Sequence, residues 1–255
     1  MIVDTHAHLQ RPELRDDLDR VLERAHAQGV TRAIVVGTDL DSSRQASALA
    51  ADHEGLHATA GIHPCAARHH GPGHYATLEE LIRSGAFLAV GETGLDQHHS
   101  GLADRAEQLD GFHFQLDLAR RVDLPVVIHC RKAFADVAAC LREHEGVRGV
   151  LHCFSEGPHE QEVFLALGLH ISFAGPVTRG SSRKLRRAAK LTPLDRLLVE
   201  TDCPFLPPMG AGEGPNGPHG ARAVAETLAE LRGVPLEELA AATSRNAEGL
   251  FGLPR

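Results

Sequence analysis

Two histidines separated by one residue stand near the start of the chain, in the segment DTHAHL at residues 4–9. Side chains two residues apart in an extended strand point to the same face, so a strand here would aim the imidazoles of His6 and His8 at one point. Imidazole is a common metal ligand. An isolated H-x-H pattern fits ordinary hydrogen-bonded histidines equally well, so the rest of the chain has to distinguish the two interpretations.

The elements that would position these residues alternate regularly along the chain. Amphipathic stretches such as residues 13–29 and 105–122 carry apolar residues at helical spacing and separate short β-branched segments. Eight strand-then-helix units in about 250 residues predict an α/β fold, a TIM (β/α)8 barrel with residues 1–255 as a single domain. The predicted strands are residues 2–5, 32–38, 57–62, 87–92, 125–130, 149–154, 169–174 and 196–201.

Residues of metal-binding type follow several of these predicted strands at the same end. In TIM barrels the chemistry lies at the carboxyl ends of the strands, so these residues are predicted to meet there. The chain has 18 histidines, but a set of ligand types at one end of five strands is hard to obtain by chance. The candidates are His6 and His8 on the first strand, Glu92 on the fourth, His129 on the fifth, His152 on the sixth and Asp202 on the eighth.

Composition sets limits on the class of protein. The formal charge of −8 weakly disfavours an extended basic surface that coats duplex DNA, although local clusters and bound cations can still form a positive site. The first residues lack the charged and apolar segments of a targeting sequence, and no apolar run is long enough to span a membrane. Five cysteines without C-x-x-C spacing fit a reducing compartment. We therefore expect a soluble, cytoplasmic protein without membrane partners, acting as a monomer.

The motifs together resemble the TatD-type metal-dependent hydrolases, within the wider group of amidohydrolase-like barrels. The similarity spans nearly the whole chain, and the combination of motifs is specific. The matching segments are D-T-H-A-H (4–8), G-I-H-P (61–64), G-E-T-G-L-D (91–96), V-V-I-H-C-R (126–131), L-H-C-F-S (151–155), V-E-T-D-C-P (199–204), a Q-x-x-x-F-x-x-Q pattern from Gln108 to Gln115, and T-x-x-N-A-x-x-L-F from Thr243 to Phe251.

The resemblance implies a site for two divalent metal ions. It assigns His6, His8, Glu92 and Asp202 to one cation and Glu92, His129 and His152 to the other, with Glu92 as the bridge. A carboxylate can span two cations about 3.5–4 Å apart, which can activate a water and clamp an in-line displacement. Glu92 and Asp202 are the implied catalytic residues, with Asp202 as the base that accepts the proton of that water. The ligand types do not choose among Zn, Mg and Mn.

The resemblance further implies a deoxyribonuclease or phosphodiesterase that acts on DNA, at 3' ends or single strands, in degradation or repair. The predicted fourth strand has no lysine that could replace Glu92 as the bridge, which favours this branch over lysine-bridged amidases. The alternatives are an aminoacyl-tRNA deacylase or small-molecule amidohydrolase using the same metals, and a metal-binding protein without catalysis. The predicted substrate contacts are His63 and Arg131 for phosphate, Arg179 at the start of a basic run over residues 178–190, and Phe154 and Phe205 for stacking on bases.

Two departures from the family pattern bear on the substrate. Glu156 follows the L-H-C-F-S motif and adds a negative charge near the predicted phosphate contacts. The loop after the last strand, residues 204–220, carries P-N-G-P at 215–218 where the family's usual motif has an arginine and a carboxylate. Hydrolysis is expected to tolerate these changes better than substrate identity does.

Overall fold

The strands form a closed parallel barrel, which confirms the predicted α/β architecture. The computed structural model describes residues 1–99, 103–211 and 214–254. Eight strands follow one another around a single sheet in sequence order, and each neighbouring pair is parallel. They are β1 (Ile2–Ala7), β2 (Val30–Val36), β3 (Leu56–Ala60), β4 (Ala89–Asp96), β5 (Val126–Arg131), β6 (Gly149–Leu151), β7 (His170–Phe173) and β8 (Leu197–Val199).

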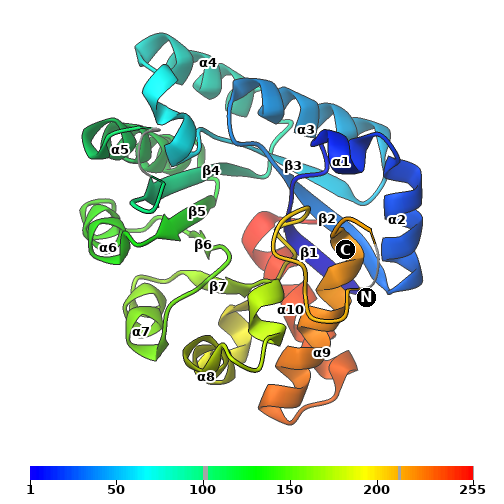
Figure 1. The fold of residues 1–255 in the computed structure, drawn as a ribbon. Coiled ribbons are helices and arrows are strands. Elements are labelled where there is room, and N and C mark those ends of the chain that lie inside the picture. The colour runs from blue at the N-terminus through cyan, green and yellow to red at the C-terminus, as the bar shows by residue number, and fades with distance from the viewer. Residues whose placement is uncertain (100–102, 212–213, 255) are drawn as a thin grey trace.

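Helices surround the barrel and connect the strands (Figure 1). The helix expected over residues 105–122 is present with those bounds, and a capping box between Asp104 and Glu107 defines its start. The α-helices are α1 (Pro12–Arg15), α2 (Leu18–Ala27), α3 (Leu40–Asp52), α4 (Pro72–Arg83), α5 (Arg105–Val122), α6 (Phe134–Glu143), α7 (Pro158–Ala166), α8 (Arg183–Leu191), α9 (Ala221–Arg232) and α10 (Leu236–Phe251). The 3-10 helices are η1 (Pro64–His69), η2 (Gly175–Thr178), η3 (Leu194–Arg196) and η4 (Pro218–Gly220).

Strand bounds differ from the sequence prediction at places that matter for the site. Strand β4 continues beyond Glu92 to Asp96, because residues 94–96 pair in register with residues 129–131 of β5. Gly94 permits this pairing, since a Cβ on it would meet the His129 carbonyl oxygen. Strands β6 and β8 end earlier than predicted, so His152 and Asp202 lie on the segments that follow them.

The barrel closes where the first strand meets the segment after the last. Ala7 and Cys203 form a parallel bridge, and the His8 N–H donates to the Cys203 carbonyl at 2.8 Å. The buried carboxylate of Asp4 accepts hydrogen bonds from the backbone N–H and the hydroxyl of Thr201, at 2.9 and 2.6 Å. Closure therefore places the end of β1 directly beside Asp202, whose N–H donates to the His6 carbonyl at 2.9 Å.

Helix α10 covers the amino end of the barrel. Ala247, Leu250 and Phe251 pack in one cluster with the inward-facing residues of six strands. Asn246 donates to the carbonyls of Leu194 and Leu197 at the start of β8, and the Ser244 hydroxyl donates to the Met1 carbonyl. The residues of the T-x-x-N-A-x-x-L-F motif therefore close the core rather than carry chemistry. The strand residues of this cluster are Val3, Ile34, Val36, Ala89, Val127, Val150 and Leu198.

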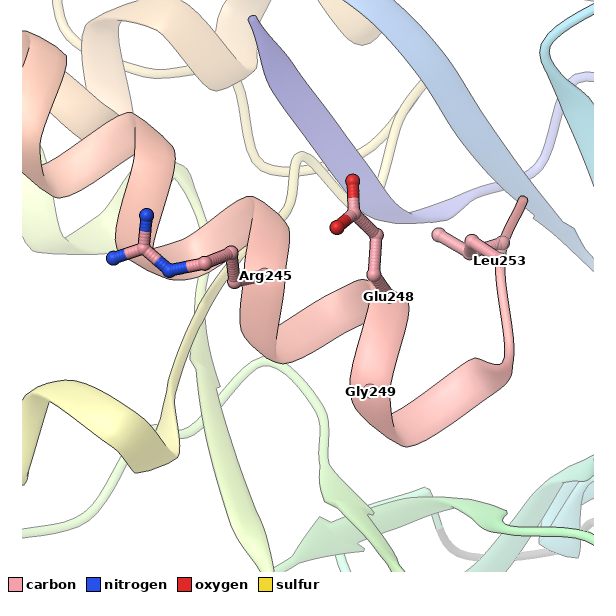
Figure 2. Close-up of a pocket in the computed structure, with 4 residues that line it drawn as sticks. All are labelled: Arg245, Glu248, Gly249 and Leu253. Carbon is pink, nitrogen blue, oxygen red and sulfur yellow. The ribbon is translucent and has the colours of Figure 1, made fainter. Parts of the chain in front are cut away.

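A surface pocket of about 410 Å³ lies beside α10. Figure 2 shows its lining, with Arg245, Glu248 and Gly249 on the helix and Leu253 on the segment after it. The Glu248 carboxylate is already paired with Arg32 at 2.6 Å. The pocket lies at the amino end of the barrel, so it is remote from the predicted ligands. Among the described residues, no helix combines the length and the apolar character needed to cross a lipid bilayer.

Candidate metal centre

Six side chains of metal-binding type converge at the carboxyl end of the barrel. All are buried or nearly so, and Glu92 of β4 lies between the others with a side chain only 4% exposed. Its two carboxylate oxygens face different partners. The strands and the segments that directly follow them thus bring together the full set that the sequence predicted, His6, His8, Glu92, His129, His152 and Asp202.

One group of donor atoms surrounds Glu92 Oε2. This oxygen lies 3.4 Å from His6 Nε2 and 3.8 Å from His8 Nε2, and the two imidazole nitrogens are 3.3 Å apart. Asp202 Oδ1 completes the group at 3.7 Å from His6 Nε2 and 3.4 Å from His8 Nε2. Ligand atoms at about 2.1 Å from one ion are separated by roughly 3.0–3.4 Å. These four residues therefore fit a divalent cation with little adjustment.

A second group surrounds Glu92 Oε1. This oxygen lies 3.1 Å from His129 Nδ1 and 2.8 Å from His152 Nε2, and the two nitrogens are 3.3 Å apart. The separations again match those of donors around one ion. The carboxylate of Glu92 is thus placed to share its two oxygens between two cation sites.

Hydrogen bonds fix the orientation of the ligand histidines. His8 Nδ1 lies 3.0 Å from the Val36 carbonyl, which can only accept, so the proton is on Nδ1 and the lone pair on Nε2. His129 is turned the other way, with Nε2 3.1 Å from Asp96 Oδ2 and Nδ1 facing Glu92. A carboxylate or carbonyl that holds the outer nitrogen in this way directs the inner lone pair at the metal.

Two buried carboxylates behind the ligands were not singled out from the sequence. Asp96 binds His129, and Glu200 Oε1 lies 3.4 Å from His152 Nδ1 while it accepts the Cys153 N–H at 2.6 Å. Both belong to motifs that were recognised, G-E-T-G-L-D and V-E-T-D. Glu200 precedes Asp202 by two residues, and this proximity to a ligand was the available signal for its role.

His63 also faces the centre: it forms a group with Glu92 and His129 that could hold a metal ion, and in the present geometry it is placed as a hydrogen-bond donor. Its Nδ1 accepts the Cys65 N–H at 3.1 Å, so the proton lies on Nε2, which is 3.4 Å from Glu92 Oε1. Gln115 of α5 holds the preceding residue, with its side chain bonded to both the N–H and the carbonyl of Ile62. The protonated Nε2 can donate to an anionic group held at the centre.

The electrostatics of the centre favour anionic carboxylates. Burial alone would raise the pKa of Glu92, but His152, His63 and His6 together hold that pKa well below its usual range. Burial likewise opposes ionisation of Asp202, whose pKa is nonetheless lowered by His8, His6 and His152. Two anionic carboxylates among imidazoles form the donor set that divalent cations bind.

The predicted stacking residues differ in exposure. Phe154 is only 4% exposed and packs edge-on against Phe173 of β7, so the prediction that it offers a face to a base is wrong. Phe205 is 45% exposed, lies 5.9 Å from the His8 ring and has the Arg11 guanidinium 5.0 Å from its centroid. Phe205 is therefore the exposed one of the two predicted stacking residues, and it lies beside the centre.

The predicted cationic contacts lie around the same end. Arg131 is exposed at the end of β5, and Arg179 is exposed directly after η2. In the basic helix α8, Lys184 lies 3.6 Å from both Glu156 and Glu160, so the negative charge of Glu156 is locally compensated. Arg186 donates to the Val177 carbonyl at 3.0 Å, which ties α8 to η2.

The loop after β8 borders the centre on the side of η2. The Asn216 amide donates to the Phe205 carbonyl, and the Met209 N–H donates to the Thr178 hydroxyl at 2.8 Å. Gly175 of η2 allows this packing, because a Cβ there would overlap the Leu206 carbonyl oxygen. Residues 212–213 of the loop lie outside the described residues. Asn216, in the P-N-G-P segment, therefore helps to position Phe205.

Comparisons with known proteins agree with this fold and site. The family model of TatD-related DNases matches residues 3–252. The uncharacterized metal-dependent hydrolase YabD of Bacillus subtilis is 38% identical over 253 residues, covering 98% of this chain and 99% of that protein. The 3'-5' ssDNA/RNA exonuclease TatD of Erwinia amylovora is 36% identical over 258 residues, with 98% and 99% covered.

The solved structure of a relative has the same fold over the whole chain. The crystal structure of YjjV, a TatD homolog from Escherichia coli K12, superimposes with a TM-score of 0.93 at 33% identity, covering 99% of this chain and 98% of that chain. The chain therefore belongs to the TatD-related DNase family of metal-dependent hydrolases.

Proposed function

We propose that this protein is a phosphodiesterase that uses two divalent cations to hydrolyse nucleic acid from the ends of single strands. The observation that carries the proposal is the division of the ligands over Glu92. Oε2 faces His6 and His8 while Oε1 faces His129 and His152, at distances of 2.8–3.8 Å. Two cation sites that share one carboxylate suit an in-line displacement at phosphorus.

The residues around the two sites have separate tasks in this reaction. Bound Zn, Mg or Mn ions would supply Lewis-acid polarisation of the phosphate and a lowered pKa for water. Asp202 accepts the proton of the attacking water, since its carboxylate is anionic and lies at the edge of the first site. His63 donates a hydrogen bond from its Nε2–H to a phosphate oxygen, and the guanidinium of Arg131 balances the charge of the phosphate.

The surroundings of the centre favour a single strand over a duplex. One exposed aromatic ring, Phe205, stands beside the ligand His8 and can stack on an unpaired base without reading its identity. The net charge of −8 offers little general attraction for a duplex, so phosphate contacts would come from Arg131, Arg179 and α8. The similarity to the Erwinia relative, a 3'-5' ssDNA/RNA exonuclease, supports this substrate class.

The proposal is tested with one panel of substrates on one preparation. The purified chain is stripped of metal with a chelator, resupplied with Mg, Mn or Zn, and assayed on single-stranded DNA labelled at either end, bis-nitrophenyl phosphate and an aminoacyl ester. We expect metal-dependent release of nucleotides from one end of the DNA and hydrolysis of the small phosphodiester. Hydrolysis of the aminoacyl ester without phosphodiester cleavage would instead assign the site to carbonyl chemistry.

A further inference from the structure

Three further side chains of metal-binding type meet at the rim of the barrel, outside the six-residue centre. They are Cys65 on η1, Asp96 at the end of β4 and His99 on the loop after β4, and their donor atoms all lie within 4.8 Å of one another. Asp96 Oδ2 is 2.8 Å from His99 Nδ1 and 4.0 Å from Cys65 Sγ. We refer to these three residues as the rim cluster.

The carboxylate at the middle of the rim cluster is held rigidly. Asp96 Oδ1 accepts the N–H groups of His98 and His99 at 2.8 and 3.0 Å, which leaves Oδ2 facing the cluster. Gln108 of α5 accepts the Asp96 N–H at 2.8 Å and donates to the Asp96 carbonyl at 3.0 Å. The side chain of Asp96 is 1% exposed, so the position of Oδ2 is fixed before any cation binds.

The two outer donors are accessible and can adjust. The side chain of His99 is 46% exposed, and Cys65 is partly exposed. In a tetrahedral zinc site, a sulfur at about 2.3 Å and an oxygen at about 2.0 Å from the ion are roughly 3.5 Å apart. Cys65 Sγ therefore needs to approach Asp96 Oδ2 by only about half an ångström, and His99 offers a path of entry from solvent.

We propose that Cys65, Asp96 and His99 bind a third divalent cation, of the zinc class. Thiolate, imidazole and carboxylate are the three ligand types that zinc takes from proteins, whereas magnesium and calcium avoid sulfur. Three protein donors leave the fourth position to water or to an anionic group. The proposal does not depend on the substrate of the main centre.

The rim cluster is joined to the main centre through one shared oxygen. Asp96 Oδ2 also lies 3.1 Å from His129 Nε2, and His129 presents its other nitrogen to Glu92. A cation at the rim cluster would therefore bind the same Asp96 oxygen that orients His129 in the main centre. Occupancy of the rim cluster is in this way coupled to the position of His129.

Cobalt provides a readout that distinguishes the rim cluster from the main centre. The six residues of the main centre offer only nitrogen and oxygen, so a sulfur-to-cobalt charge-transfer absorption can arise only at a cation bound by a cysteine. The metal-free full chain is titrated with Co²⁺ while the ultraviolet and visible spectra and the bound cobalt are measured. We expect three ions per chain and a charge-transfer band that saturates with one of them.

Variants assign the band to the three residues. Cys65→Ala is expected to abolish it and to leave two ions per chain, and His99→Ala to weaken binding of that ion by roughly tenfold or more. The matched controls are Cys140→Ala, a thiol on α6, and His98→Ala, the neighbouring exposed histidine, and both should retain the band.

The outcomes that overturn the proposal are also defined. An absent band in the unmodified chain, or a band that survives Cys65→Ala, would show that the rim cluster does not hold the ion. The d–d absorption of cobalt at the main centre is recorded in the same titration. A failure of the rim cluster is therefore distinguished from a failure of the two-cation centre, in which the d–d bands of the first two ions would be missing.

Discussion

Among the residues described at the candidate centre, Glu92 contacts the largest number of the others. Its oxygens face the imidazoles of His6, His8, His129 and His152, and His63 approaches it as well. A carboxylate between two groups of donors can bind two cations at once, which a neutral imidazole with one free lone pair cannot do. If both candidate sites bind a cation, binding at each would involve this one side chain.

We expect Glu92→Ala to lose at least one of the two cations, because both sites lose their shared anionic ligand. Metal content is measured after reconstitution with Mn or Zn and removal of free ions. Glu156→Ala serves as the control, since this carboxylate pairs with Lys184 outside the centre. If Glu92→Ala retains the full metal content, Glu92 is not the bridge.

Asp202→Asn separates proton transfer from metal binding. The amide keeps the shape of the side chain but cannot accept a proton, so turnover is expected to fall by ~10²–10⁴. Turnover is measured on a small phosphodiester at saturating metal, with the exposed Asp195→Asn as the control. Near-normal turnover in Asp202→Asn would remove this residue from the proton transfer.

At the scale of elements, α5 fixes two segments of the active end. Gln115 binds the backbone of Ile62, just before His63, and Gln108 binds the backbone of Asp96. Both glutamines are buried, and each pairs with one backbone N–H and one backbone carbonyl of the residue it holds. The helix thus sets the distance between His63 and Asp96 without contacting the centre itself.

Replacing Gln115 with leucine should therefore affect both stability and activity. The variant leaves the N–H and carbonyl of Ile62 buried without this partner, which costs about 1–3 kcal/mol for each group. We expect a lower free energy of unfolding in urea and a reduced kcat with His63 no longer held. Gln28→Leu, at the exposed end of α2, is the control that should change neither quantity. An unchanged kcat in Gln115→Leu would show that His63 needs no support from α5.

Helix α8 tests whether the substrate is a polymer. The double variant Arg183→Ala/Arg187→Ala should raise the KM for single-stranded DNA and flatten its salt dependence, because fewer counterions are released on binding. Arg186 is left in place because it supports η2 through Val177. Hydrolysis of a small phosphodiester should not change.

The control for α8 removes the same charge elsewhere, as Arg20→Ala/Arg44→Ala on α2 and α3. An equal effect of both double variants would indicate a general change in charge. If neither double variant has an effect, α8 is an ordinary solvated helix without a role in substrate binding.

The elements also show which features the sequence could predict. The eight strands were recognisable because β-branched runs recur between amphipathic helices, and the ligands because their types recur at strand ends. The extension of β4 to Asp96 was not recognisable from the sequence, because it depends on pairing with β5. The roles of Asp96 and Glu200 depend on distances to His129 and His152 across the barrel, which no local pattern encodes. Burial of Phe154 likewise follows from packing against β7.

At the scale of the whole molecule, the two ends of the barrel have different tasks. The amino end is closed by α10 and its apolar residues, while the carboxyl end carries the candidate metal centre and the exposed Phe205. This division matches the general rule that function in such barrels lies at the carboxyl face and stability at the other. Phe251 at the amino end and Phe205 at the carboxyl end allow this division to be tested.

Phe251→Ala should destabilise the protein by about 3–5 kcal/mol, because the ring is 3% exposed and fills the core under α10. Below its unfolding transition this variant should keep its metal content and kcat. Phe205→Ala should have nearly unchanged stability but bind single-stranded DNA less tightly, by about 1–3 kcal/mol if the ring stacks on one base. Urea unfolding and DNA titration measure the pair, and effects in the reverse pattern would contradict the division.

Closure of the ring between β1 and the segment after β8 determines when the centre can exist during synthesis. Asp202 and Cys203, which hold His6 and His8 in place, leave the ribosome some 195 residues after these histidines. Helix α10, which fills the amino end, comes later still. At 5–20 residues per second, roughly ten seconds or more separate the first ligands from the last. The ligand set is therefore incomplete until Asp202 has emerged, and we expect the metal ions to bind after that point in synthesis.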